Sequence, residues 1–216
     1  MVFFTYIACA LAAYLLGSIP TGYLMAKAKG IDIRTVGSGN IGATNAMRVL
    51  GKPAGILVLI LDALKGGLAV WLLPWLAAAY LLPPAAPVGA RPLIAIIAGF
   101  SAIAGHVFTC WLKFKGGKGI ATSCGVYFAL APLACALCLG VWFLMLAVTR
   151  YVSVASIIAS VGLPFAVALT QDSLVLTLCT VGVSALAIYK HKPNIQRLLN
   201  GTEHRVGRID PTAPPA

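Results

Sequence analysis

The sequence predicts an all-α integral membrane protein, a bundle of seven transmembrane helices with one short fourth span. Of its 216 residues, 60% are hydrophobic and only 10% are charged. The mean hydropathy of +0.95 does not describe a soluble domain. Apolar runs of about 20 residues, the length that crosses a hydrocarbon core, recur along the chain. We therefore expect a single polytopic membrane domain over residues 1–209 and a disordered, Pro-rich tail at 210–216.

The first apolar run indicates the orientation. It extends from Val2 to Met25 with no basic residue before it, whereas Lys27 and Lys29 follow it directly. The positive-inside rule then places the N-terminus outside. A cleaved signal peptide would instead carry positive charge ahead of the apolar stretch, so this run is interpreted as a permanent span. The expected spans are 2–25, 53–74, 93–112, 120–131, 133–149, 154–169 and 174–189, which leave the C-terminus cytoplasmic.

The apolar sequence from 120 to 149 is too long for one crossing and too short for two full ones. Pro132 indicates a break, so a short outward helix over Ile120–Ala131 is expected, with a re-entrant hairpin as the alternative. In this topology Arg91 is the only basic residue outside and Lys65 the only one within a span. All the other Lys and Arg side chains face the cytoplasm, which supports the assignment.

Acidic residues are scarce, and this scarcity excludes several chemistries. They are Asp32, Asp62, Asp172, Glu203 and Asp210. No two are close in sequence, which argues against paired carboxylates and carboxylate-bound metal clusters. Neither a metal nor a cofactor is expected. The net charge of +11 lies mainly in short loops, where it sets topology, so nucleic-acid binding is not indicated.

Residues 37–48 form the first of three cytoplasmic segments with chemical potential. Three glycines among residues 37–42 let backbone N–H groups converge on one point, and Arg48 offers a planar fork for phosphate. The segment is typical of an anion-binding loop. A flexible loop with one orienting arginine is the competing interpretation.

The second segment, residues 114–122, opens directly into an apolar helix. Backbone donors at a helix N-terminus, together with Lys115 and Lys118, suit a phosphate-bearing ligand. Topology alone would explain the lysines but not three glycines within residues 116–119, so an anion site is favoured.

The third segment, residues 191–203, predicts a short interfacial helix that Pro193 opens and Gly201 closes. An amphipathic anchor and a functional role are equally favoured by this segment alone. The expected apolar face carries Ile195, Leu198 and Leu199, and the expected polar face carries Asn194, Gln196 and Arg197.

Two charged residues lie within the second span. Asp62 and Lys65 share a helix face, and Asp62 is about 14 Å from the Pro53 end at 1.5 Å per residue. Charges at that depth are costly unless paired, so a structural ion pair is favoured over a catalytic role. His106, near the inner end of the third span, is treated as a structural intramembrane residue with them.

Taken in order, these segments resemble one family, the bacterial membrane acyl-phosphate:glycerol-3-phosphate acyltransferases of the PlsY type. The likeness covers most of the chain, and it depends on the order and spacing of several motifs, since each alone is weak. The motifs are GSIPTG (17–22), GSGNIGATN (37–45), LDALKG (61–66), GH (105–106), FKGGKGIAT (114–122), RYVS (150–153) and HKPNIQRLLNGTE (191–203). The family also implies the seven-span, N-out arrangement.

The resemblance implies transfer of a fatty acyl group from acyl phosphate to the 1-hydroxyl of sn-glycerol 3-phosphate, giving lysophosphatidic acid and phosphate. This is the first acylation of phospholipid synthesis. The implied partners are these two substrates and membrane lipid, at the cytoplasmic face of the bacterial inner membrane. The catalytic residues carried over are Ser38, Arg48, Lys118, Ser156, His191 and Asn194. The substrate-binding residues carried over are Asn40, Thr44, Asn45, Lys115, Gly116, Gly117 and Arg197.

Three alternatives stay open from the residues alone. The base that takes the glycerol proton is either His191 or a phosphate oxygen of the substrate. Ser38 could carry the acyl group covalently, but no base is adjacent in sequence, so a hydrogen-bonding role is favoured. The alternative function is a membrane transporter or binding protein for an organic phosphate. It is disfavoured because two similar halves are missing and the anion-binding groups lie at one face.

Overall fold

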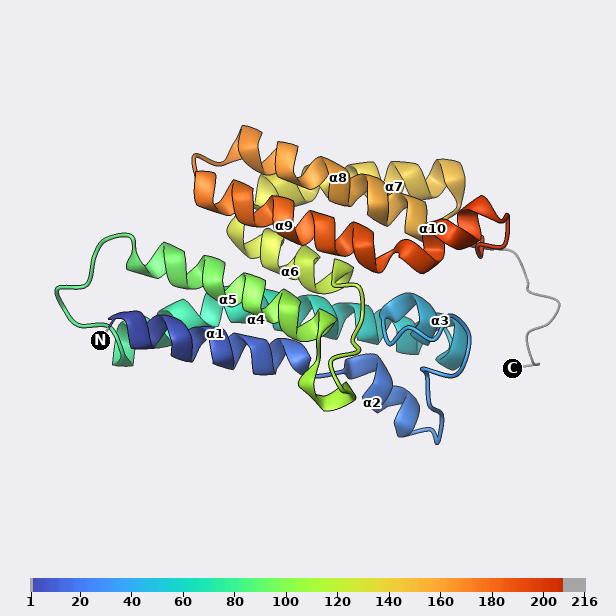
Figure 1. Ribbon diagram of the computed structural model, residues 1–216, viewed down its shortest axis with the longest axis horizontal. Helices are drawn as coiled ribbons and strands as arrows, with labels where there is room; N and C mark the ends of the chain where they lie inside the picture. Colours follow the sequence, from blue (N-terminus) through green and yellow to red (C-terminus); the bar gives the residue numbers. More distant parts are fainter. Residues whose placement is uncertain (1, 208–216) are drawn as a thin grey trace. The chain divides into compact units, whose positions relative to one another are not determined.

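The computed structural model in Figure 1 describes residues 2–207, and every regular element in that range is helical. The all-α expectation is confirmed. The elements are α1 (Val2–Ser18), α2 (Thr21–Lys27), α3 (Ala43–Leu50), α4 (Lys52–Tyr80), α5 (Ala90–Val107), the 3₁₀ turn η1 (Cys110–Leu112), α6 (Ile120–Leu130), α7 (Pro132–Thr149), α8 (Val152–Thr170), α9 (Leu174–Lys190) and α10 (Lys192–Leu199).

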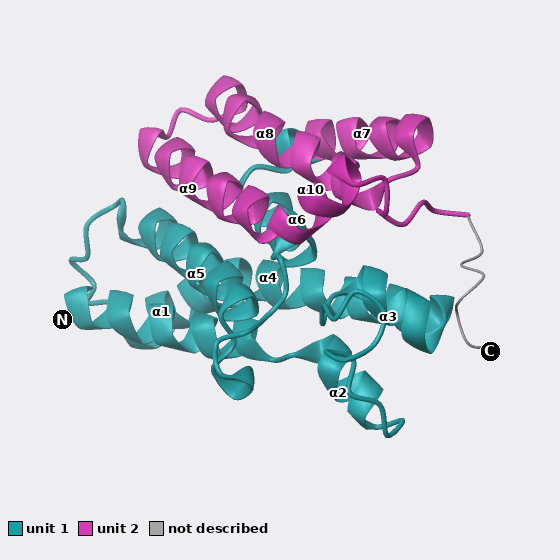
Figure 2. Cartoon of the chain, turned by 45° about the vertical axis from the view of Figure 1, so that its right-hand side comes forward, with its two compact units in different colours: residues 1–135 teal, residues 136–216 magenta. Residues whose placement is uncertain are grey.

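The chain forms two compact units, Met1–Cys135 and Ala136–Ala216, which Figure 2 colours separately. The expectation of a single domain over 1–209 stays a prediction. The expected disordered tail at 210–216 lies outside the described residues.

Five segments of the described chain have the length and apolar composition to cross a membrane. They are Val2–Lys27, Lys52–Tyr80, Ala90–Leu112, Pro132–Thr149 and Val152–Thr170. The pair α9 and α10, bent by 50° at the break between them, is a sixth candidate if the two helices form one broken span. The helix α6 has 11 residues and spans about 16 Å at 1.5 Å per residue, about half of a hydrocarbon core. The count of seven crossings and the orientation of the termini therefore stay predictions.

Three expected spans have different helix boundaries. The span expected at 93–112 is α5, which begins at Ala90 and ends at Val107, before the turn η1. The first apolar run is broken at Ile19 and Pro20, because proline cannot donate the hydrogen bond that would continue α1. The second span does not end at Pro74 but continues to Tyr80. Within a membrane an internal proline is tolerated in a helix because neighbouring groups satisfy the freed carbonyl.

Glycines bring the helices of the first unit into backbone contact. In the pair α1 and α5, a Cβ at Gly17 would overlap the carbonyl oxygen of Ala102. In the pair α4 and α6, a Cβ at Gly66 would overlap the carbonyl oxygen of Thr122, and one at Gly125 would overlap that of Ala63. Helix association in lipid depends on such close packing, because the hydrophobic effect does not favour one apolar contact over another there.

Gly66 and Gly67 provide a matched test of this packing. Gly66→Ala forces α4 away from the α6 backbone, whereas the added Cβ at Gly67 would meet the nearest atom, the Gly125 carbonyl oxygen, at an ordinary 3.4 Å. We expect Gly66→Ala to lower the free energy of unfolding by about 1–3 kcal/mol. Gly67→Ala should be neutral or stabilising by up to about 1 kcal/mol through helix propensity. Thermal unfolding in detergent measures both, and equal effects of the two changes would contradict the packing account.

Candidate active site

The first glycine-rich segment divides into a turn and a helix. Gly37 and Gly39 adopt φ values of 61° and 69°, which side chains rarely permit, so the chain reverses there. Gly42 is the N-cap of α3, and its own N–H donates to Oδ1 of Asn40 at 2.9 Å. Thr44 and Arg48 therefore lie on a helix that the sequence analysis treated as loop. Both side chains are exposed, and the first N–H groups of α3 lack partners within the helix, as at any helix start.

Asn45 fastens this segment. Its amide nitrogen donates to the carbonyl oxygens of Ile33 and Val36 at 3.2 and 3.1 Å, and its oxygen accepts the N–H of Ser38 at 2.8 Å. The side chain is 2% exposed. Both N–H donors of the Asn45 side-chain amide are thus engaged by carbonyl oxygens of the loop, and its oxygen holds the Ser38 backbone in position.

An exposed ion pair closes the start of the loop. Arg34 donates from Nε and Nη2 to the two oxygens of Asp32, at 2.9 and 2.6 Å, and its guanidinium carbon lies 4.9 Å from the centre of the Tyr23 ring. The hydrogen bonds from Arg34 lower the pKa of Asp32 to about 2. The carboxylate is therefore charged at neutral pH and engages Arg34, whereas Arg48 is the arginine on the α3 side of the loop.

The second glycine-rich segment folds back along the end of α5. The N–H groups of Gly116 and Gly117 donate to the carbonyl oxygens of Val107 and His106, at 3.1 and 3.0 Å. Before them, Lys113 and Phe114 both adopt a positive φ, 53° and 60°, which reverses the chain. The two glycine amides are thus engaged within the protein. The groups of this segment that suit an anion are the first N–H groups of α6 and the side chain of Lys118, which is partly exposed.

Glycine is required at both positions by the closeness of α5. A Cβ at Gly116 would overlap the carbonyl oxygen of His106 and lie 2.8 Å from that of Val107. A Cβ at Gly117 would overlap Nε2 of the His106 ring. These glycines are explained by close approach, and neither needs a positive φ.

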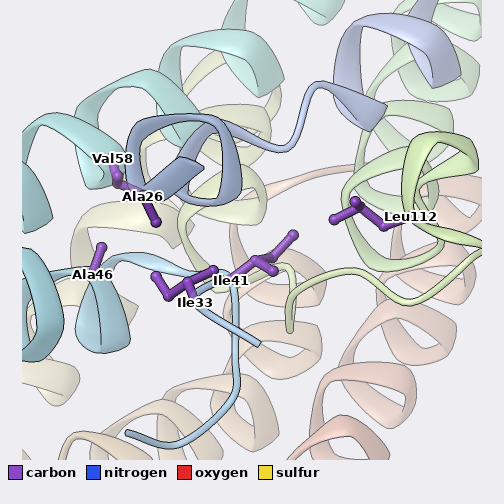
Figure 3. Packing of buried hydrophobic residues seen from close by; sticks show 6 residues of the cluster. All are labelled: Ala26, Ile33, Ile41, Ala46, Val58 and Leu112. Carbon is purple, nitrogen blue, oxygen red and sulfur yellow. The ribbon is translucent and has the colours of Figure 1, made fainter. Parts of the chain in front are cut away.

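The first glycine-rich segment packs on a hydrophobic core that also includes the turn just before the second segment. The core contains Ile33, Ile41 and Ala46 from the first segment and its approach, and Leu112 from the turn just before the second. Ala26 and Val58 complete it, as Figure 3 shows. This core thus connects the loop and helix that carry Ser38, Asn40, Thr44, Asn45 and Arg48 to the turn that precedes Lys115, Gly116, Gly117 and Lys118.

In the second unit, the Glu203 carboxylate collects three donors. Oε1 accepts from Ser153 Oγ at 2.9 Å and from Asn194 Nδ2 at 2.7 Å, and Oε2 accepts from Arg197 Nε at 2.7 Å. Burial by itself would raise the pKa of Glu203, but the hydrogen bonds from Asn194, Arg197 and Ser153 outweigh it and lower the pKa below its ordinary value of 4.5. The charged carboxylate therefore joins α10 to the start of α8.

The chain after Glu203 is tied to the same region. The N–H of Val206 donates to the carbonyl oxygen of Arg150 at 2.8 Å, and the Arg205 guanidinium lies 5.1 Å from the centre of the Tyr151 ring. Arg150 itself has a φ of 62°, a left-handed turn between α7 and α8. Residues 203–206 thus return to the point where α8 begins.

Ser156 and His191 are both buried in the second unit. The indole N–H of Trp142 donates to Ser156 Oγ at 3.1 Å, which joins α7 to α8. Nδ1 of His191 lies 2.7 Å from the carbonyl oxygen of Ala187, a contact that requires the proton on Nδ1. In a neutral imidazole that tautomer leaves Nε2 as an acceptor.

Each expected face of α10 contains one residue whose burial is notable. Asn194, on the expected polar face, is buried and donates to the Glu203 carboxylate. Leu199, on the expected apolar face, is 82% exposed. The remaining predicted polar residues, Gln196 and Arg197, are exposed and partly exposed.

A family model for glycerol-3-phosphate acyltransferase matches residues 7–201, nearly the whole described chain. The chain belongs to this glycerol-3-phosphate acyltransferase family. A glycerol-3-phosphate acyltransferase of Geotalea daltonii is 48% identical over 194 residues, which cover 90% of this chain and 94% of the relative. The glycerol-3-phosphate acyltransferase of Geobacter metallireducens is 51% identical over 193 residues, which cover 89% of this chain and 93% of the relative.

Two solved structures have the same fold. One is a crystal structure of PlsY, an integral membrane glycerol 3-phosphate acyltransferase, in its glycerol 3-phosphate form. It is 38% identical, with a TM-score of 0.82, and the match covers 94% of this chain and 96% of the other. The lysophosphatidic acid form of PlsY is 37% identical, with a TM-score of 0.79 and coverage of 94% and 95%. The chain is accordingly a PlsY-family acyltransferase and a multi-pass membrane protein.

Sequence reasoning missed three features of this acyltransferase. Glu203 was not proposed for the site, although it was the only acidic residue within a predicted functional segment. The contact of Trp142 with Ser156 had no signal in the sequence. The engagement of the Gly116 and Gly117 amides with α5 could not be foreseen, because it depends on how the loop folds back.

The Glu203 contacts make this acyltransferase sensitive to pH in a defined direction. Because the folded-state pKa of Glu203 is lowered, its contribution to stability is complete above about pH 4.5 and is lost as pH falls through the lowered pKa. Glu203→Gln should lower the free energy of unfolding at pH 7 by about 1.5–3 kcal/mol, as expected for hydrogen bonds to a charged group. The difference from wild type should shrink below pH 4.5.

Thermal unfolding of both proteins between pH 3 and 7 measures this difference. The control is Asp172→Asn, the same chemical change at an exposed carboxylate of the second unit. A Glu203→Gln deficit that is constant across this range, or is matched by the control, would show that the charge of Glu203 contributes nothing.

Proposed function

We propose that this chain transfers a fatty acyl group from acyl phosphate to the 1-hydroxyl of sn-glycerol 3-phosphate, releasing lysophosphatidic acid and inorganic phosphate. The reaction takes place at the cytoplasmic face of the bacterial inner membrane. The observation that carries the proposal is the pair of glycine-rich segments in the first unit, each with helix N–H groups and a basic side chain suited to phosphate. The glycerol 3-phosphate and lysophosphatidic acid forms of the PlsY relative support the acceptor and the product.

The acyl phosphate donor fits the residues available. An acyl phosphate is already activated, and its phosphate leaves with little need of protonation. The protein therefore has to align the acceptor hydroxyl with the acyl carbon and to stabilise developing negative charge. Among residues 2–207 no group of three or more His, Cys, Asp or Glu side chains could hold a metal ion, and this mechanism requires none.

The first unit supplies the phosphate-binding groups. Arg48 and Lys118 hold phosphate charge, and Lys115 is an additional exposed cation in the second segment. Ser38 donates a hydrogen bond from a backbone position that Asn45 fixes. Asn40 and Thr44 shape the start of α3, where the anion meets the first amides of the helix.

In the second unit, the family resemblance assigns roles to His191, Asn194, Arg197 and Ser156. His191, whose Nε2 is the acceptor nitrogen of the neutral ring, is the protein's candidate for the base, while a substrate phosphate oxygen is the alternative. Asn194 and Arg197 are oriented by Glu203, and Ser156 by Trp142. Their roles as donors to substrate follow from the family resemblance.

The donor assignment predicts a simple specificity. Purified protein given palmitoyl phosphate and glycerol 3-phosphate should release phosphate and form lysophosphatidic acid, whereas palmitoyl-CoA should give no product. The compact basic loops offer the binding groups for a phosphate. Phosphate release and lipid chromatography measure the two products. Turnover with palmitoyl-CoA and none with palmitoyl phosphate would refute the proposed donor.

Arg48 and Lys118 are predicted to act on the transition state. Changing either to Ala should lower kcat by about 10²–10³, as for loss of one electrostatic stabiliser in a water-poor site. Arg48→Lys should recover little, because an ammonium cannot reproduce a bidentate fork. The control is Arg34→Lys, since Arg34 is already engaged by Asp32. Steady-state kinetics measure kcat of each variant. An Arg48→Lys enzyme with near wild-type kcat would contradict bidentate binding.

A further inference from the structure

A buried carboxylate joins the helices α2, α4 and α5 of the first unit near the second glycine-rich segment. Oδ1 of Asp62, on α4, accepts from Thr21 Oγ1 at 3.0 Å and from Lys65 Nζ at 2.8 Å. Nδ1 of His106 lies 3.6 Å from the same oxygen. Lys65 also donates to the carbonyl oxygen of Ile19 at 2.8 Å, which satisfies the break between α1 and α2. All of these ionisable side chains are at most 6% exposed.

His106 connects this cluster to the second glycine-rich segment. One edge of its ring, Nδ1, faces Asp62, and the other edge, Nε2, lies where a Cβ of Gly117 would be. The His106 carbonyl oxygen accepts the Gly117 N–H at 3.0 Å, so both the ring and the backbone of one residue support the loop. Lys118 follows directly.

The end of α5 that carries His106 is itself held in place. Thr109 Oγ1 donates to the carbonyl oxygen of Ser18 at 2.6 Å. The Tyr14 hydroxyl donates to the carbonyl oxygen of Phe108, also at 2.6 Å. Gly105 lies against the α1 backbone, where a Cβ would overlap the Tyr14 carbonyl oxygen. The ring therefore has little freedom to move away from Gly117, because its helix is fixed to α1 and its Nδ1 edge faces the Asp62 carboxyl group.

We propose that His106 is a positioning residue for the phosphate site: it is oriented by Asp62, its ring supports Gly117, and it thereby places Lys118 and the first amides of α6. The inference rests on the proposed function, because it takes the loop over residues 115–119 to bind a substrate phosphate. It gives the buried cluster a role beyond pairing charges.

The test uses the lack of space between the His106 ring and Gly117, where any side chain would clash with the ring. Gly117→Ala places a methyl group on Nε2 and 2.9 Å from Cε1, but 3.1 Å from Cδ2. Asn in place of His106 keeps atoms at the positions of Nδ1 and Cδ2 and removes the two that clash most. His106→Asn should therefore suppress Gly117→Ala.

Gly116→Ala is the matched control. Its added methyl group meets the carbonyl oxygens of His106 and Val107, which are backbone atoms that no change of the His106 side chain removes. His106→Asn should leave the defect of Gly116→Ala unchanged. His106→Leu, which fills the space without a polar edge toward Asp62, tests the contact with the carboxylate.

Two readouts separate this inference from the proposed function. The first is kcat and KM for palmitoyl phosphate and glycerol 3-phosphate. The second is the rise in unfolding temperature on adding inorganic phosphate, which needs no turnover. We expect Gly117→Ala to raise a phosphate-substrate KM, and His106→Asn to recover that loss by about fivefold or more, within the range of coupling between residues in contact. The recovery with His106→Leu should be smaller.

Each outcome bears on one idea. Suppression of Gly117→Ala but not of Gly116→Ala supports the inference. Equal suppression of both, suppression of neither, or a His106→Leu enzyme that matches wild type overturns it. A wild type that is stabilised by phosphate but does not turn over palmitoyl phosphate refutes the proposed donor, and the stabilisation readout then decides the role of His106. A wild type that phosphate does not stabilise overturns the inference itself.

Discussion

Contact between backbones at glycine is the constraint on which the first unit depends. In a bilayer, apolar side chains gain little by leaving lipid for one another, so helices associate where their backbones come close. Gly17 and Gly105 serve this purpose between α1 and α5, and Gly66 and Gly125 between α4 and α6. The same requirement recurs outside the helices at Gly116, where the loop lies against α5 carbonyl oxygens. Helix spacing and loop shape therefore have one physical cause.

The buried charge cluster follows from that close packing. A carboxylate removed from water needs donors from its surroundings, and Asp62 finds them on α2 and within α4, beside a histidine of α5. Those groups reach one oxygen only because the helices carrying them are tightly packed. The pairing of Asp62 with Lys65 was foreseeable from their spacing of three residues, whereas the contribution of Thr21 requires the break at Pro20.

The sequence predicted the later helices closely because apolar runs and their interruptions determine them. The run expected at 174–189 is α9 (Leu174–Lys190), and the short helix expected at 120–131 is α6 (Ile120–Leu130). Pro132 and Arg150 mark breaks that composition alone reveals. The helix α3 was missed because its sequence is short and polar, and its start depends on a turn at glycines with positive φ.

Prediction of the site was limited in the same way by what a linear pattern can encode. Glycines next to a lysine indicate an anion loop, but they do not say which amides are available to the anion, and those of Gly116 and Gly117 donate to α5.

Residues 203–206 return to the start of α8, so residues 150–206 form a closed loop. Val206 is joined to Arg150, so α8, α9 and α10 lie between two tethered points. A chain that frays from its end must first break this tether and then release Glu203, which frees Asn194 and Arg197 together. Unfolding that begins after α10 would thus reach buried side chains in a fixed order. The few residues after α10 hold the loop over residues 150–206 closed.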